Sequence, residues 1–289
     1  MATNTSTFAQ SAEGPTLARP SATEFGIDLG RALAGALLFA LPMLMTMEMW
    51  WLGFYMDPLR LALLLAILLP LLVRLSRYGG LRPTASLWDD LADALVCIGA
   101  AFVAATAILC IFGVITAEMP IREIIGKVAL ETFAGSIGAM LSRTQLGSKE
   151  AMEEKESAEQ SYSGEIFLMI VGALFLSLNV APTEEMILIA FQMNVWQEIG
   201  LILLTLILMH ALVYSVELGG TERPDPDKAF WSVFARFTVV GYALVLLVSL
   251  YVLWTFGRTD DTAIHEIISM VVVLSFPGAI GAAAARLIL

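Results

Sequence analysis

The sequence has few charged residues and a large excess of apolar ones. Charged side chains make up 15% of the 289 residues, hydrophobic residues make up 58%, and the mean hydropathy is +0.80. Soluble domains are normally about half apolar and about a quarter charged. A soluble domain could not bury this much apolar surface, so the composition excludes a soluble protein and predicts a membrane protein.

Motifs that would indicate an enzyme are also missing. The chain has no phosphate-binding loop, no Gly-x-Ser-x-Gly elbow, no His-Glu-x-x-His helix and no haem or thiol motif. It has two histidines, and its two cysteines, Cys97 and Cys110, fall in one apolar run, which favours core thiols over a disulfide or a metal site. No basic patch is interleaved with aromatic residues. We therefore predict no enzyme, no cofactor and no nucleic-acid partner.

Long apolar runs are what the sequence has in quantity. A membrane-spanning helix needs about 20 mostly apolar residues, and lipid excludes open strands, so each span must be a helix. Eight segments qualify, and the sequence therefore predicts an all-α polytopic membrane protein. The expected spans cover roughly 29–54, 59–77, 90–115, 120–142, 165–190, 198–217, 232–256 and 264–288.

Two parts of the chain resemble each other without gaps. One pair of segments matches around Glu48 and Glu185, and the other matches around Glu123 and Glu266. Four spans per repeat is an even number, so the sequence predicts two parallel four-helix repeats related by a pseudo-two-fold axis along the membrane normal. The expected organisation is a disordered tail (1–24), a first repeat (25–143), an acidic linker (144–163) and a second repeat (164–289).

The positive charges are distributed unevenly between the two sides of the predicted topology. Only four of the 16 Lys and Arg residues fall on one side, namely Arg60, Arg122, Lys127 and Arg258. Because cytoplasmic loops carry an excess of Lys and Arg, both termini are predicted to be cytoplasmic.

The repeated glutamates are the main candidates for chemistry. Glu48 and Glu185 are expected about three quarters of the way across their spans, and Glu123 and Glu266 in the first turn of helices that enter from the outer side. Ionisable groups at membrane depth are candidates for function, and neighbouring carboxylates share protons or bind cations. The alternative is structural, because a carboxylate near a helix N-terminus stabilises the helix dipole.

The most irregular segment runs from Asn179 to Glu185. Pro182 lacks a backbone donor, so exposed carbonyls together with Asn179, Glu184 and Glu185 could form a cation site in a broken helix. In the alternative interpretation, Pro182 precedes a new helix whose first turn contains Thr183 and the two glutamates. The sequence leaves both interpretations open.

Two further patterns concern helix packing. Asp93 aligns with Arg236 in the repeat, which allows an inner ion pair acting as a gate, a static ion pair, or two separate charges that each reach the interface. Gly135 and Gly138 recur as Gly278 and Gly281, and small residues at this spacing predict close helix packing, which we expect across the interface between the repeats.

The repeat, the stretch Pro182-Thr183-Glu184-Glu185-Met186 and the small-residue helix near the C-terminus look like a family of bacterial integral membrane proteins. That family has no established activity. The resemblance implies a bacterial inner (plasma) membrane location and says nothing about a substrate.

The leading hypothesis is a cation transport protein, either a channel or a proton-coupled transporter, with Ca²⁺ or H⁺ as the favoured ion. In this hypothesis Glu48, Glu185, Glu184 and Asn179 bind the ion, Glu123 and Glu266 form an outer vestibule, and Asp93 with Arg236 forms the inner gate. The alternative is a non-transporting membrane scaffold or sensor with structural acids. The lipid bilayer is the expected partner, and homo-oligomerisation is left open.

Overall fold

The structure, a computed structural model, describes residues 22–79, 86–146, 162–219 and 234–288, and all regular elements within these ranges are helical. Eight helical segments in the described residues are long and apolar enough to cross a membrane, which confirms the predicted number of spans. Helix begins at Ala22, inside the residues expected to form a tail, and most of the expected linker 144–163 lies outside the described residues.

The first half of the described chain, residues 22–146, contains four long helices and one short helix. α1 (Ala22–Leu44) leads to the nine-residue α2 (Met47–Tyr55), and α3 (Pro58–Gly79), α4 (Leu87–Ile111) and α5 (Ile121–Leu146) follow. α4 begins in a capping box: the Ser86 hydroxyl accepts from the Asp89 amide, and the Asp89 carboxylate accepts from the Ser86 amide. This exchange satisfies backbone donors in the first turn of the helix.

The second half, residues 162–288, has the same order of elements. α7 (Tyr162–Val180) leads to the nine-residue α8 (Glu184–Gln192) and then to α9 (Val195–Gly219). A π-helical turn, η1 (Phe234–Val239), continues directly into α11 (Val240–Thr255), and α12 (Ile264–Ile288) follows. The shared order agrees with the repeat in the sequence, but the pseudo-two-fold axis stays a prediction.

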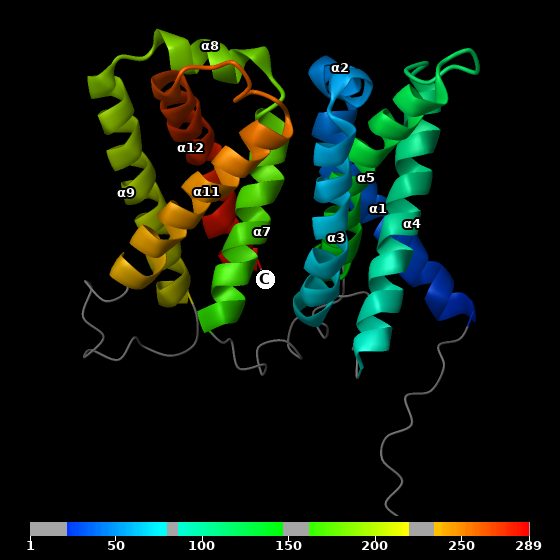
Figure 1. Ribbon diagram of the computed structural model, residues 1–289. Helices are drawn as coiled ribbons and strands as arrows, with labels where there is room; N and C mark the ends of the chain where they lie inside the picture. Colours follow the sequence, from blue (N-terminus) through cyan, green and yellow to red (C-terminus); the bar gives the residue numbers. More distant parts are fainter. Residues whose placement is uncertain (1–21, 80–85, 147–161, 220–233, 289) are drawn as a thin grey trace, which may run out of the picture.

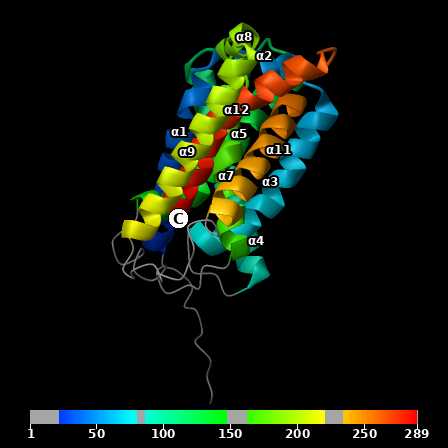
Figure 2. The ribbon, with the colours of Figure 1, turned by 90° about the vertical axis from the view of Figure 1, so that its left-hand side faces the viewer.

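The faces of the molecule are defined by the short helices. α2 and α8 lie at one end of the bundle, at the top of Figure 1, and we call this end the α2–α8 face. The opposite end, where α1 begins and α12 ends, is the terminal face. The long helices run between the two faces, with a common tilt in the view of Figure 2.

Two of the predicted spans are wrong in extent. The single span expected over 29–54 ends at Leu44, and the chain turns before α2 begins at Met47. Thr46 has an extended backbone there, and its hydroxyl donates to the carbonyl of Pro42 at 2.6 Å. The span expected over 165–190 is likewise divided between α7 and α8. Apolar residues continue through both turns, so hydropathy alone did not reveal them.

Close helix packing occurs inside each half rather than between the halves. α5 lies along α1, and α12 lies along α7. A methyl group on Gly35 would overlap the carbonyl oxygen of Gly138, and a methyl group on Gly172 would overlap that of Gly281. The glycine pattern therefore predicted close packing correctly. The expectation that it joins the two repeats is wrong.

The two halves meet through aromatic and charged side chains. The rings of Phe39 in α1 and Phe175 in α7 are 4.7 Å apart between centroids. Near the α2–α8 face, Arg60 of α3 donates to both carboxylate oxygens of Asp260, at 2.9 and 2.8 Å, and lies 4.9 Å from the Trp254 ring centroid. These contacts join a core of buried side chains that extends through both halves.

Candidate functional site

Glu48 and Glu185 lie at the surface end of short helices and not deep in a span. Each is in the first turn of its helix, Glu48 in α2 and Glu185 in α8. Glu48 is half-buried and Glu185 is exposed. The predicted depth of three quarters of a span is therefore wrong, because the preceding helices end at Leu44 and Val180. In these positions both carboxylates face the positive end of a helix dipole.

The segment around Pro182 forms a new helix start, as the structural alternative expected. Thr183 is the N-cap of α8, and Arg258 donates to the carbonyl of Pro182 and to the Glu184 carboxylate at 3.3 Å. Asn179 donates its side-chain amide to the carbonyl of Phe175 at 2.7 Å. Two of the four groups expected to bind an ion, Asn179 and Glu184, thus have a partner within the protein, although the buried Oδ1 of Asn179 has no hydrogen-bond partner among the described residues.

The predicted vestibule residues also have structural partners. Glu123 forms an ion pair with Lys127, 2.7 Å between Oε1 and Nζ. Glu266 accepts from the backbone amide of Ala263 at 3.3 Å and so caps the start of α12. Both helices begin at the α2–α8 face, so the prediction that all four repeated acids lie toward one face agrees with the structure.

The predicted gate pair is not formed. Asp93 is buried in α4, whereas Arg236 is exposed in η1 with its guanidinium 5.2 Å from the ring centroid of Tyr162. Figure 1 places α4 and the start of α11 on opposite flanks of the molecule. Aligned positions in two repeats need not be neighbours, because they meet only if both helices line the axis.

The structure reveals a buried carboxylate in a spanning helix, Glu131, that the sequence analysis missed. Glu131 of α5 is 1% exposed, and its Oε2 has no hydrogen-bond partner among the described residues. It is ten residues into a helix that starts at Ile121, which places it about 15 Å below the α2–α8 face. Burying a charge without a partner is costly, so such a residue is a candidate for function.

Neighbouring residues on α5 show which side of the helix Glu131 occupies. Residues four apart share a helix face, and Gly135 is four residues after Glu131. A methyl group on Gly135 would lie 3.1 Å from the Ala101 Cβ of α4 and 3.6 Å from the Ala36 carbonyl oxygen of α1. Glu131 therefore lies on the side of α5 that packs against α1 and α4, inside the first half.

Three ionisable residues form a file along this side of α5. Glu123, Lys127 and Glu131 are each four residues apart. The exposed fraction of the side chain is 18% for Glu123 and 9% for Lys127, and Glu131 is 1% exposed as a residue. Lys127 also donates to the carbonyl of Val114 at 3.2 Å. The file thus runs from the α2–α8 face into the bundle. Its four-residue spacing was visible in the sequence and is the signal that could have identified Glu131.

A surface pocket of about 360 Å³ reaches the upper part of this file. Its walls are Trp50, Trp51 and Phe54 of α2, with Glu123 and Lys127 of α5. The indole of Trp50 donates to the carbonyl of Leu44 at 2.9 Å, which satisfies a free carbonyl at the end of α1 and fixes α2 beside α5. The turn between α1 and α2 therefore creates the pocket wall.

Comparison with known proteins then identifies the family. Residues 28–289 match the family described as "Putative integral membrane protein (DUF2391)". The chain belongs to this family. It is therefore an integral membrane protein, as the composition and the resemblance predicted. Neither the curated proteins nor the solved structures gave a match.

The file in this family member contains a carboxyl group that can bind and release a proton. Ca²⁺ takes six to eight oxygen ligands. No three His, Cys, Asp or Glu side chains within the described ranges are grouped so that they could hold a metal ion. A single carboxyl group suffices to bind and release a proton, and Glu131 is such a group at membrane depth.

Proposed function

We propose that the protein transports cations, with protons as the favoured ion, and that Glu131 is the residue that binds and releases the proton inside the membrane. The supporting observation is the burial of Glu131 in a spanning helix without a hydrogen-bond partner for its Oε2 among the described residues. Intramembrane carboxylates are typical of proton relays in pumps and transporters. The transport mode is that of a channel or of a proton-coupled transporter.

The proton reaches Glu131 from the α2–α8 face. Glu123 and Lys127 line the pocket beside α2, and Glu131 follows one helical turn after Lys127. Negative charge at the mouth raises the local cation concentration. Glu48, Glu184, Glu185 and Glu266 also lie in first turns that begin at this face, so they add to its negative charge.

Orientation follows from the distribution of Lys and Arg. With both termini in the cytoplasm of a bacterial cell, the α2–α8 face and its pocket are on the outside of the inner membrane. Protons then reach Glu131 from the outside. The path from Glu131 to the cytoplasm runs through the packed part of α1, α4 and α5 that is nearer to the terminal face.

The test is proton flux into liposomes that contain the purified full-length chain and a trapped pH-sensitive dye. A potassium gradient with valinomycin supplies the driving force. Wild-type protein is expected to acidify the lumen, and Glu131→Gln, which keeps the side-chain shape, is expected to lower the rate about 100-fold because proton transfer by a positioned group contributes at least that much. Glu131→Asp, which keeps the carboxyl group, is expected to retain part of the rate.

The matched control is the double variant Glu48→Gln with Glu185→Gln, which changes two surface acids and leaves the file intact. Its rate is expected to stay within about threefold of wild type, because exposed charges affect the local concentration only. Flux unchanged in Glu131→Gln contradicts the assignment of Glu131. No flux of H⁺, Na⁺, K⁺ or Ca²⁺ by the wild-type protein contradicts transport and supports the scaffold alternative.

A further inference from the structure

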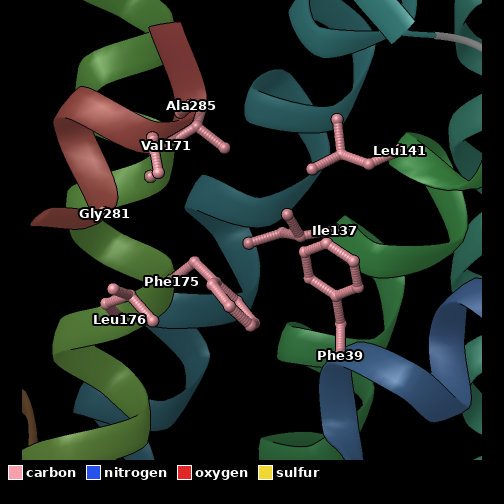
Figure 3. A pocket seen from close by; sticks show the side chains of 10 residues that line it. Phe39, Ile137, Leu141, Val171, Phe175, Leu176, Gly281 and Ala285 are labelled. Carbon is pink, nitrogen blue, oxygen red and sulfur yellow. The ribbon is translucent and has the colours of Figure 1, made fainter. Parts of the chain in front are cut away.

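A second pocket lies between the two halves, at membrane depth. It has a volume of about 200 Å³, and its ten lining residues are all apolar. Figure 3 shows side chains of the first half facing those of the second half across this pocket. The lining comes from α1, α5, α7 and α12, and includes Phe39, Ile137, Leu141, Val171, Phe175 and Leu176.

The position of these residues along their helices gives the depth of the pocket. Phe39 and Phe175 each lie five residues, or about 8 Å, before the end of a helix at the α2–α8 face. Leu141 and Ala285 lie five and three residues before the ends of α5 and α12 at the terminal face. The pocket therefore lies within the spanning part of the bundle, away from both of its ends.

The size of the pocket limits what can occupy it. The volume of about 200 Å³ and the wholly apolar lining suit an apolar ligand. A single acyl chain, which is a narrow row of methylene groups, fits this pocket. Because hydrocarbon gains little by moving from lipid to an apolar pocket, an acyl chain stays there only if its head group is also held.

A cation lies against Phe167 of α7, one helical turn beyond the pocket lining. Arg74 of α3 is exposed, and its guanidinium is 4.9 Å from the ring centroid of Phe167. Phe167 is four residues before Val171 on α7, so it continues the pocket wall by one turn toward the terminal face. Within the described residues no carboxylate is paired with Arg74, whereas the neighbouring Arg77 forms an ion pair with Asp90 at 3.1 Å.

We propose that this pocket binds one acyl chain of an anionic phospholipid from the bilayer, with the lipid phosphate held by Arg74. Arginine forms strong, often two-pronged hydrogen bonds with phosphate oxygens. The lipid then lies between the two halves and contacts both. The inference does not depend on the transport proposed above.

The test uses vesicles of phosphatidylcholine that contain the full-length protein and a trace of phosphatidylglycerol with a photoreactive group on one acyl chain. After illumination, labelled peptides are identified by mass spectrometry. We expect labelling of peptides that contain Ile137, Leu141 or Phe175. Unlabelled phosphatidylglycerol should compete, and additional phosphatidylcholine should not.

Two variants separate the tail from the head group. Ala284→Trp fills the pocket and is expected to remove most of this labelling, whereas Ala107→Trp, an equal change at an exposed position of α4, is expected to leave it unchanged. Arg74→Gln is expected to weaken competition by phosphatidylglycerol about tenfold, since a charge-assisted hydrogen bond to phosphate is worth about that factor.

Several results would overturn the proposal. These are labelling that is uniform over exposed helices such as α9, competition by phosphatidylcholine as strong as by phosphatidylglycerol, or unchanged labelling in Ala284→Trp. A change from dimer to monomer in Ala284→Trp without loss of labelling would assign the pocket to contact with a second copy of the chain instead.

Discussion

The final helices of the two halves, α5 and α12, differ in what they bury. In the 18-residue apolar part of α5, 83% of the residues are buried, and in that of α12, 56% are buried. Glu123 aligns with Glu266, but four and eight residues later α5 has Lys127 and Glu131 where α12 has Met270 and Leu274. The more enclosed helix thus carries the ionisable file, and the less enclosed helix has apolar residues there.

Among the described residues of the second half, the fully buried polar ones are serines and threonines, and the Arg286–Glu165 ion pair is only partly buried. A methyl group on Gly278 would lie 2.9 Å from the Ser177 Oγ and 3.7 Å from the Ser249 Oγ. Both hydroxyls are buried and lack a hydrogen-bond partner in the part of the chain that the structure describes. The two halves, each with a close glycine pair, therefore differ in one respect: fully buried carboxylates occur among the described residues of the first half and not among those of the second. The proposed proton transport therefore involves the first half.

The largest expected effect comes from placing a carboxylate in the second half. Leu274 is fully buried, so Leu274→Glu is expected to lower the free energy of unfolding by about 3–5 kcal/mol, as for an uncompensated buried charge. Leu274→Met is the matched control and should cost less than about 1.5 kcal/mol. Chemical denaturation in mixed micelles measures both. Equal stability of the two variants would mean that the second half tolerates a buried carboxylate as the first half does.

The glycine pairs should be equally sensitive in both halves. Gly35→Val and Gly172→Val each introduce a side chain where a methyl group already overlaps a carbonyl oxygen, so each is expected to destabilise the protein by about 3 kcal/mol. Gly200→Val is the control, since a methyl group there has no neighbour within 4 Å. If only one of the two glycine substitutions lowers the free energy of unfolding, the close glycine contact is not a shared feature of the two halves.

Making the first half resemble the second should raise stability. Glu131→Leu removes a buried polar group without a partner for its Oε2 among the described residues, and the free energy of unfolding is expected to rise by about 1–3 kcal/mol. Proton flux should be lost in the same variant. Lower stability would indicate that Glu131 is satisfied by water or an ion in the membrane, and would contradict the view of an unpaired carboxylate.

The smallest effect concerns the short helix that walls the outer pocket. Trp50→Phe removes the hydrogen bond to the Leu44 carbonyl and is expected to cost about 1 kcal/mol. Trp51→Phe, at an exposed neighbouring position of α2, should change stability by less than about 0.5 kcal/mol. If both substitutions cost the same, the indole of Trp50 does not fix α2 in place.

Hydropathy predicted the spans well and their ends poorly. The six segments without an internal turn correspond to α3, α4, α5, α9, α11 with η1, and α12. The two turns at Met45–Thr46 and Ala181–Thr183 were missed as span ends because the residues beyond them, such as Met47, Trp51 and Phe191, are also apolar. These side chains are exposed at the surface of α2 and α8, so their hydropathy does not indicate continuation of a span.

The candidate site was predicted only in its outer part. Repetition pointed to Glu48, Glu123, Glu185 and Glu266, and the structure shows all four in first turns at one face. Glu131 has no counterpart in the second repeat, so a search based on repetition passed over it. Whether a carboxylate in a span is paired, hydrated or isolated depends on neighbouring helices, and a single helix sequence does not contain that information.

The sequence by itself determined the number of spanning helices, the side to which the repeated acids belong and the glycines that permit close packing, because each follows from local composition or spacing. Only the tertiary structure decided that the close glycine pairs lie within each half, that Glu131 faces α1 and α4, and that an apolar pocket lies between the halves. These features depend on which helices are neighbours. The contact between Arg74 and Phe167, from different halves of the chain, has the same origin.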